Sequence, residues 1–590
     1  MNNRNLLLLG LILVFVGGLL AWNVQTNGGT IEIKDVRFVG TNGTLMSALL
    51  YIPPDVTAEN PAPAVLAVHG YINSRETQAG YAIEFARRGF VVLALDQTGH
   101  GYSDPPAFGN GFGGPDGLAY LRSLDIVDTD NIGLEGHSMG GWAIGIAAGA
   151  FPDGYASINL QGSSTGTFGS PEGTTEFPRN LAVTFSQWDE FAPFMWGGET
   201  APDIVNIEKL QNAFGTEEPV VVGELYGSIE EGTARILYQP ATNHPGDHLN
   251  SAAIGSAVEW MQMTLDGGSD LDPSDQIWQW NEIGRLIAYI GMIVSMLAFG
   301  GLLLKTVYFN SIVHPLPEAM PMTGPMRWLG YVLAAGIPAI TFFWTQTSFL
   351  NFLMGPENPL LFTAPTPLFA QSITNGVVVW ALTNAVITLV LFLIWHFTSN
   401  KGATLENYAM PIHWPHIFKS ALLAICVLTF GYLLLAAADL VFRIDFRFWV
   451  VTAKLMSPLQ FRMFLGYLPF FVIFFLITGV ALHGQLRLVT STGDDVPMWR
   501  AMLANVGLLV TGIIVLLLIQ YIPLIAGSPL PLGEPLLTIV AYQFIPLLTI
   551  AAIVMTYFFR KTGTLYTGAF LSALFITWVV VAGQATHFAF

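Results

Sequence analysis

The chain has 590 residues, of which 52% are hydrophobic and only 11% are charged. Residues 24–281 hold 9 of the 23 Lys and Arg residues but 32 of the 41 Asp and Glu residues, so a strongly acidic segment is enclosed by apolar sequence. This segment is long enough for one globular domain. Its acidity argues against nucleic acid as a partner, because phosphate contacts require Lys and Arg.

Nine apolar runs are long enough to cross a bilayer, which takes about 20 helical residues. The chain is therefore predicted to be a multi-pass membrane protein, with the lipid bilayer as a partner. The first run is also compatible with a signal peptide, but no small-x-small cleavage site follows it, so an uncleaved anchor is preferred. The nine predicted spans are residues 6–22, 283–304, 328–344, 375–397, 418–441, 463–482, 503–522, 536–558 and 565–583.

These runs divide the chain into four predicted parts. They are an N-terminal transmembrane anchor (1–24), a soluble domain (25–267), a linker (268–282) and a membrane domain of about eight helices (283–590).

The Lys and Arg residues of the loops predict how the spans are oriented. With the N-terminus in the cytoplasm, most of these residues fall on the inner side, and the apolar outer loops 345–374 and 523–535 hold none. The outer loop 442–462 is the exception, because it carries four of them. The prediction is a cell-membrane protein with the acidic segment outside the cytoplasm and the two apolar loops at the bilayer surface beneath it.

The acidic segment alternates predicted strands and helices. Residues 31–40 and 44–53 are expected to form two strands, joined by Thr41-Asn42-Gly43, and Asn-Gly is a strong hairpin signal. Six further apolar runs alternate with helical stretches: "AVLAVHG", "FVVLALD", "NIGLEG", "YASINLQ", "NLAVTFS" and "RILYQP". This pattern predicts an α/β domain whose mostly parallel sheet is covered by helices on both faces. The sequence predicts an all-α membrane bundle in addition to this α/β domain. Ligand sites in such sheets lie at the carboxyl ends of the strands.

Two Gly-x-Ser-x-Gly pentapeptides occur, "GHSMG" around Ser138 and "GSSTG" around Ser164. Ser138 follows an apolar strand and precedes small residues and a helix, which favours a sharp strand-to-helix turn that exposes a nucleophile. Ser164 runs into "TFGSPEGTT", which has no helical period, so we interpret Ser164 as a turn residue. Ser138 is therefore the candidate nucleophile.

Residues 31–265 resemble the α/β-hydrolase fold superfamily. The segments that carry the resemblance are "VHGYINSRE", "FARRGFVVLALDQTGHGYSD", "GLEGHSMGG", "SQWDEFAP" and "NHPGDH", in the family's order. The prolyl-oligopeptidase-like and dienelactone-hydrolase-like branches are the most similar in style. The resemblance implies a serine hydrolase whose nucleophile, acid and histidine follow one another along the chain.

A serine hydroxyl needs a base within hydrogen-bond reach and a third group that orients the base. The resemblance places the acid at Asp189 and the base at His244, and leaves His248 as an alternative base. The side chain of Glu190, next to the acid, is expected to point elsewhere from an extended backbone.

The resemblance also implies two backbone N–H donors to the oxyanion, those of Tyr71 and Met139. No cofactor and no metal site is predicted. The segment after the acid is rich in large apolar side chains, which are candidate contacts for an apolar acyl chain. These candidates are Phe191, Phe194, Met195 and Trp196.

The sequence thus predicts a membrane-embedded serine hydrolase that cleaves ester-like bonds, with lipidic acyl esters as a candidate substrate class and with peptidase or acyltransferase activity as variants of the same chemistry. The alternative from another class is a transporter or membrane receptor that uses the hydrolase fold as a binding module. The natural substrate, the role of the eight-helix bundle and the oligomeric state are left open.

Overall fold

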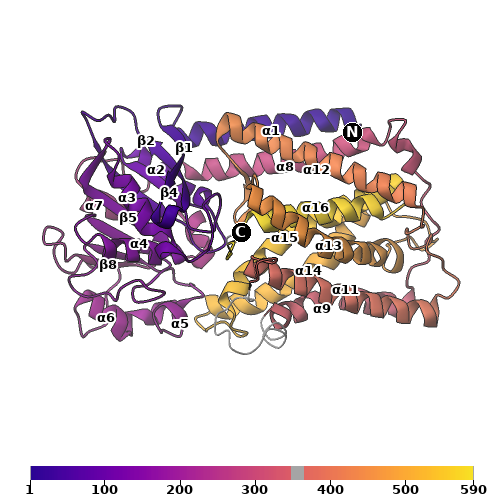
Figure 1. The fold of residues 1–590 in the computed structure, drawn as a ribbon. Helices are drawn as coiled ribbons and strands as arrows, with labels where there is room; N and C mark the ends of the chain where they lie inside the picture. The colour runs from indigo at the N-terminus through magenta and orange to yellow at the C-terminus, as the bar shows by residue number, and fades with distance from the viewer. Residues whose placement is uncertain (1, 347–364, 589–590) are drawn as a thin grey trace.

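The computed structural model describes residues 2–346 and 365–588. It has two parts that lie end to end, a sheet domain (residues 31–265) and a helical bundle that contains α1 and the helices from α8 onward (Figure 1). Helix α1 (Asn3–Gln25) runs from the far end of the bundle to the sheet domain, and α8 (Trp278–Leu303) returns along it (Figure 1).

The sheet has eight strands in the order β1-β2-β4-β3-β5-β6-β7-β8. Strands β1 and β2 form the predicted antiparallel hairpin, and Asn42 in its turn has a φ of 58°. From β4 to β8 every neighbouring pair is parallel, which confirms the predicted fold class. The strands are β1 (Glu32–Val39), β2 (Leu45–Ile52), β3 (Ala62–Val68), β4 (Val91–Asp96), β5 (Val127–His137), β6 (Ser157–Gln161), β7 (Leu181–Thr184) and β8 (Arg235–Tyr238).

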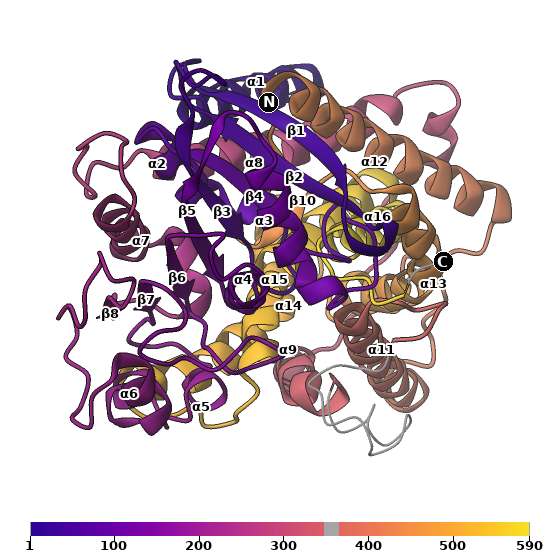
Figure 2. The same ribbon diagram turned by 60° about the vertical axis from the view of Figure 1, so that its left-hand side comes forward.

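Helices cover both faces of this sheet, because its central strands are apolar on both sides. In β4, Val92 and Ala94 pack with α2 and α7, whereas Leu93 and Leu95 belong to the core on the side of α3 and α4. Figure 2 shows the layers from a second direction. The helices of this domain are α2 (Ala79–Arg87), α3 (Gly114–Arg122), α4 (Met139–Ala150), α5 (Ala192–Met195), α6 (Glu208–Phe214) and α7 (Ser251–Thr264).

All nine predicted apolar runs form helices. Within the described residues, eight helices are long and apolar enough to cross a membrane. The ninth, α16, has 17 residues, fewer than the roughly 20 that a span needs. The predicted outer loop 345–374 falls largely on residues 347–364, outside the described residues. The remaining bundle helices are α9 (Gly324–Gln346), α11 (Ser372–Ser399), α12 (Trp414–Phe442), α13 (Pro458–Val480), α14 (Met498–Ile525), α15 (Pro535–Thr562) and α16 (Tyr566–Ala582).

Helices α1 and α8 approach each other closely through small residues. A Cβ atom on Gly17 would lie 2.5 Å from the carbonyl oxygen of Gly284, and one on Gly291 would lie 2.7 Å from that of Gly10. Glycines at such spacing let two helix backbones come into contact, as in many membrane proteins. Helix α1 is thus packed against α8 as part of the bundle.

A buried ion-pair network joins the sheet domain to the bundle. Glu76 of the sheet domain pairs with Arg75, with Nε 3.2 Å from Oε1, and with Lys454 of the bundle, whose Nζ lies 3.2 Å from Oε2. Burial raises the pKa of Glu76, but the charges of Lys454 and Arg75 outweigh burial and hold that pKa well below its usual range. Glu76 is therefore ionised at neutral pH and connects the two parts.

The second half of the network lies in the loop 442–462, where the predicted orientation has its exception. This loop folds into a small hairpin of β9 (Phe446–Phe448) and β10 (Val451–Ala453), which no pattern in the sequence predicted. Asp445 pairs with Arg447 and with Arg285 of α8, and the latter distance is 3.1 Å. Arg447 and Lys454, two of the four basic residues in the loop, are thus buried at the junction rather than free on a membrane surface.

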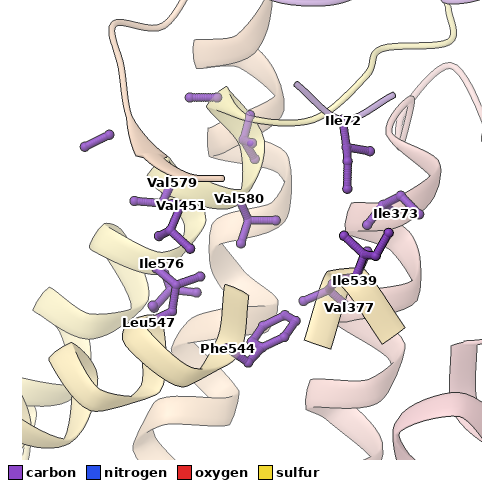
Figure 3. Packing of buried hydrophobic residues seen from close by; sticks show 14 of the residues in the cluster. Ile72, Ile373, Val377, Val451, Ile539, Phe544, Leu547, Ile576, Val579 and Val580 are labelled. Carbon is purple, nitrogen blue, oxygen red and sulfur yellow. The ribbon is translucent and has the colours of Figure 1, made fainter. Parts of the chain in front are cut away.

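Apolar side chains fill the rest of the junction. Ile72, in the loop after β3, is 6% exposed and points toward Ile373 and Ile539 of the bundle (Figure 3). Its φ of 58° is rare for a β-branched residue and needs surrounding structure to hold it. The sheet domain therefore inserts a strained loop into the bundle directly beside the carboxyl end of β3.

The ion-pair network predicts a stability effect. Glu76→Gln leaves the buried Lys454 charge with a neutral partner, so we expect the unfolding free energy to fall by about 3–5 kcal/mol. The measurement is thermal unfolding of the full-length protein in detergent. Glu32→Gln is the matched control, because Glu32 forms an exposed pair with Lys34. Equal melting temperatures for the two variants would contradict a stabilising junction.

Candidate active site

Ser138 is the single residue between the end of β5 and the start of α4. Its φ of 54° and ψ of −119° are sparsely populated by residues other than glycine. Its N–H donates to the carbonyl of Gln161 at 2.8 Å, and a Cβ on Gly140 would lie only 2.0 Å from the carbonyl oxygen of Val68. The glycine thus permits the sharp turn, and the turn places the Ser138 hydroxyl beyond the carboxyl ends of the parallel strands.

His244 and Asp189 form a buried pair. His244 Nδ1 lies 2.8 Å from Asp189 Oδ2, and the side chains are 5% and 0% exposed. The other oxygen of Asp189 accepts the backbone N–H of Phe191 at 2.8 Å. His244 is the first residue of a short 3-10 helix, His244–Leu249. This helix lies between the last strand and the last helix of the domain, as predicted. Asp189 therefore fixes the orientation of the His244 ring.

Ser138 and His244 line the same pocket. Among the described residues no hydrogen bond joins the Ser138 hydroxyl to the imidazole. In ligand-free enzymes such contacts are often long and tighten only when substrate binds. The structure thus brings the three predicted residues into one site, with the histidine–acid half already formed.

His248, the alternative base, lies in the same pocket but in a different environment. Its ring is 4.2 Å from that of His137, and neither of its nitrogens has a hydrogen-bond partner among the described residues. A general base needs an orienting group; His244 has one in Asp189, whereas the described part of the chain offers none to His248. The geometry therefore favours His244.

The two predicted oxyanion donors flank Ser138. Met139 is the first residue of α4, where backbone N–H groups have no partner within the helix. Tyr71 follows Gly70, and a Cβ on Gly70 would lie 3.1 Å from Ser138 Cβ, so this loop passes directly beside the serine. The hydroxyl of Tyr71 contacts His587 Nε2 at 2.9 Å, which ties the loop to the segment after α16.

One side of Ser138 opens into a pocket that we name the aromatic pocket. Trp142, Phe168 and Phe194 pack around it with ring centroids 4.8–6.1 Å apart. Three of the four predicted acyl contacts line it, and the fourth does not. The aromatic pocket is lined by Tyr71, Phe108, Phe112, Ser138, Met139, Trp142, Phe168, Phe191, Phe194, Met195 and Leu536. Trp196 instead is buried beneath it and donates its indole N–H to the carbonyl of Ser163 at 3.0 Å.

The other side of Ser138 opens into a more polar pocket, which we name the histidine pocket. Its polar lining consists of Asn73, His137, His244, His248 and Gln543. Tyr71, Ser138, Phe191 and Leu536 line both pockets, so Ser138 lies between them.

The helical bundle supplies part of both pockets. Leu536, Ile539 and Gln543 of α15 line the histidine pocket, and Leu536 also lines the aromatic one. These positions are three and four residues apart, so they share one face of the helix. No periodic or motif signal in the apolar sequence distinguishes these residues from others in the span.

Residues 63–193 match a family model described as the alpha/beta hydrolase fold. With the eight-stranded sheet and the strand-to-helix serine turn, this match decides the architecture. The sheet domain has the alpha/beta hydrolase fold. The hydrolase fold supports a hydrolase activity but does not by itself specify the nucleophile or the substrate.

Solved structures share the hydrolase fold at low identity. A dienelactone hydrolase from Anabaena variabilis is 16% identical, with a TM-score of 0.28, over 40% of this chain and 99% of that one. An epoxide hydrolase from an endophytic Streptomyces is 20% identical, with a TM-score of 0.19, over 22% of this chain. A hypothetical protein from Pseudomonas aeruginosa is 24% identical, with a TM-score of 0.21, also over 22%. The chain spans 37% and 42% of the last two. No curated protein matches the chain.

A second carboxylate of the hydrolase fold holds the main chain of His244. Glu190 does not contact the imidazole, as expected, but its Oε2 accepts the backbone N–H of His244 at 2.9 Å. Its Oε1 accepts Asn243 Nδ2 at 3.2 Å and the hydroxyl of Tyr521, which comes from α14 of the bundle. Burial raises the pKa of Glu190 to about 8, and the adjacent Asp189 adds to this rise while Tyr521 opposes it. Asp189 thus holds the ring of His244, and Glu190 holds its backbone.

The bundle also holds the residue that follows His244. Trp449, in the turn between β9 and β10, donates its indole N–H to the carbonyl of Pro245 at 2.9 Å. The rings of Trp449 and Tyr521 both pack against Tyr542, with centroids 5.1 and 5.3 Å away. We name Tyr521, Trp449 and Tyr542 the bundle clamp. Through the clamp, the position of the His244 loop depends on the bundle.

The electrostatic environment favours a neutral imidazole. Burial lowers the pKa of His244 below its usual value of 6.5, and the nearby Asp247 carboxylate opposes this shift. Asp247 is itself fully buried and accepts the hydroxyl of Ser186. A neutral imidazole at pH 7 can accept the proton of a serine hydroxyl.

The lowered pKa of His244 predicts how the labelling rate falls at low pH. Because the pKa of His244 is lowered, the imidazole becomes protonated only below pH 6.5, and reactivity is retained down to that lower pKa. The measurement is the rate of fluorophosphonate labelling against pH. Asp247→Asn removes the charge that raises the pKa, so its acid limb should move to still lower pH. A wild-type midpoint at or above pH 6.5 would contradict this assignment.

The bundle clamp predicts the effect of a distant substitution. Tyr521→Phe removes one donor to Glu190, so we expect labelling to slow by about three- to tenfold, the scale of one neutral hydrogen bond. Loss of this donor should also raise the pKa of Glu190 further. Any increase in labelling rate that follows the ionisation of Glu190 should therefore shift to higher pH. Tyr467→Phe is the control, because the Tyr467 hydroxyl bonds Asn375 within the bundle. Equal rates and equal pH profiles for wild type and Tyr521→Phe would rule out a role of the clamp.

Proposed function

We propose that the protein is a membrane-embedded serine hydrolase that cleaves carboxylic esters with an apolar acyl group. The observation that carries the proposal is the strained Ser138 in one pocket with His244, whose ring is held by Asp189 at 2.8 Å. This combination supports an activated serine, because a turn residue without a nucleophilic role does not need an oriented base beside it.

The proposed reaction has two steps. Ser138 Oγ attacks the ester carbonyl carbon while His244 Nε2 takes the hydroxyl proton, and the N–H groups of Tyr71 and Met139 face the developing oxyanion. The carbonyl–oxygen bond to the alcohol then breaks, and His244 returns the proton to the leaving oxygen. In the second step water attacks the acyl-enzyme with His244 as the base, so that one ester and one water give one acid and one alcohol.

The aromatic pocket supports an apolar acyl group. Its aromatic triangle of Trp142, Phe168 and Phe194 offers a large apolar surface, and burial of each acyl methylene is worth about 0.8 kcal/mol. Leu536 of the bundle completes this pocket, which favours a substrate that partitions into the bilayer. Peptidase and acyltransferase activity remain variants of the same chemistry, with an amine as leaving group or an alcohol in place of water.

We further propose that the hydrolase fold lies outside the cytoplasm, as the loop charges predict. The burial of Arg447 and Lys454 supports this orientation, because two residues that counted against it are paired with Asp445 and Glu76 at the junction. The bundle end that contacts the sheet domain then faces outward.

The test is covalent labelling with a fluorophosphonate, followed by ester hydrolysis. Labelling should occur in wild type and in Ser164→Ala, and be lost in Ser138→Ala, because only Ser138 lies beside the His244 pair. Ser164 is the matched control from the second pentapeptide, and its hydroxyl contacts Thr167 at 3.2 Å. For acyl esters of rising length, kcat/KM should rise by about three- to fourfold per methylene until the pocket is full.

Absence of labelling in a folded wild-type protein would contradict the serine hydrolase and favour the binding-module alternative. Transport or ligand binding that survives Ser138→Ala would point the same way. Hydrolysis that is insensitive to acyl length would leave the nucleophile in place but contradict the acyl role of the aromatic pocket.

A further inference from the structure

On the basis of the proposed function, we propose that the histidine pocket binds the alcohol half of the ester, and that this alcohol is polar and uncharged. The substrate class that fits is an apolar acyl group esterified to a neutral polyol, such as a glycerol or a sugar without phosphate. The bundle, through Gln543, takes part in recognising that polyol.

The position of His244 decides which pocket takes which half of the ester. The leaving oxygen must receive its proton from the imidazole, which requires hydrogen-bond distance between the two. His244 lines the histidine pocket and not the aromatic pocket, while Ser138 lines both. The alcohol must therefore leave through the histidine pocket, and the acyl chain must lie on the other side of Ser138.

The chemistry of the histidine pocket fits hydroxyl groups. His248 is 5% exposed, and its two ring nitrogens have no hydrogen-bond partner among the described residues. Gln543 lines the same pocket and is 7% exposed. A neutral imidazole and an amide each offer both a donor and an acceptor, as a hydroxyl does. Buried polar groups without partners are costly, so they indicate that the bound state supplies partners.

The charges around the pocket exclude an anionic headgroup. Among the described residues, no Lys, Arg, Asp or Glu lines either pocket. The nearest cationic groups of the junction, Lys454 and Arg447, are engaged by Glu76 and Asp445. A phosphate needs charge-assisted donors, and without them its burial is strongly unfavourable. A neutral alcohol has no such requirement.

Gln543 reaches this pocket because α15 turns one face toward the sheet domain. Leu536 lies where the two pockets meet, Ile539 is one turn further on, and Gln543 is about one turn beyond Ile539. The same helix face thus presents apolar Leu536 to both pockets and polar Gln543 to the histidine pocket alone. This order matches an ester that is apolar on one side of its carbonyl and polar on the other.

The test compares three substrates with one acyl chain in mixed detergent micelles: a methyl ester, a glycerol monoester and a glycerol monoester that carries a phosphate. For wild type we expect kcat/KM for the glycerol ester to exceed that for the methyl ester by about tenfold, and the phosphate ester to be the slowest. Gln543→Leu should lower the glycerol-to-methyl ratio by about three- to tenfold, the scale of one neutral hydrogen bond.

Gln520→Leu is the matched control, because Gln520 is a buried glutamine of the neighbouring α14 that bonds Gly533 and Thr538 within the bundle. Its glycerol-to-methyl ratio should equal that of wild type. If Gln543→Leu does not fold, the three wild-type values still decide the question.

The outcomes separate this inference from the function on which it rests. A wild type that is labelled at Ser138 and hydrolyses the glycerol and methyl esters equally well would overturn the polyol subsite alone. Faster hydrolysis of the phosphate ester would overturn the uncharged character of the pocket. A wild type without labelling and without hydrolysis of any ester would overturn the proposed function instead.

Discussion

Buried ion pairs join the carboxyl edge of the parallel sheet to the end of the helical bundle. Glu76, Lys454, Asp445 and the arginines around them are buried there as ion pairs. Removing Glu76 or Asp445 would leave the buried charge of Lys454 or Arg285 without its ion-pair partner, so these two acids hold the two parts in one arrangement. Because functional groups of parallel sheets gather at that same edge, the arrangement that joins the domains also encloses the candidate site.

Enclosure has chemical consequences. The site is lined on one side by the hydrolase fold and on the other by α15, and His244 and Asp189 are buried there. Burial keeps the imidazole neutral at pH 7, and electrostatic interactions become stronger where water is excluded. The proposed enzyme therefore differs from a soluble hydrolase tethered to a membrane, because its bundle forms walls of the site and holds the histidine loop through Tyr521 and Trp449.

The sequence was sufficient for those features that local patterns encode. Short apolar runs that alternate with helical stretches, the Asn-Gly turn and the long apolar segments predicted the sheet, the hairpin and the helices, and a short motif with its strand and helix predicted the turn at Ser138. The resemblance supplied Asp189 and His244, which the structure places 2.8 Å apart. Trp196 was grouped with the acyl contacts because it follows them in sequence, but its side chain turns under the pocket.

Other features depend on contacts between segments hundreds of residues apart, which no local pattern records. Tyr521 and Gln543 lie within apolar spans whose composition predicts only membrane insertion. The loop 442–462 carries positive charge that suggests an inner loop, yet Arg447 and Lys454 neutralise acids that lie elsewhere in the chain. Glu190 was noticed only as a neighbour of the acid, since its bond to the His244 backbone requires the folded loop. Helix α16 is apolar like a membrane span but is shorter than a span needs to be.

We propose that the hydrolase fold and the bundle together form one active site. This is tested by an experimental structure of the full-length protein in a lipid bilayer after reaction with a long-chain alkyl fluorophosphonate. We expect phosphorus bonded to Ser138 Oγ and the alkyl chain in the aromatic pocket, in contact with Phe194 and with Leu536 of α15. An adduct on another residue, or an alkyl chain that makes no contact with the bundle, would contradict this proposal.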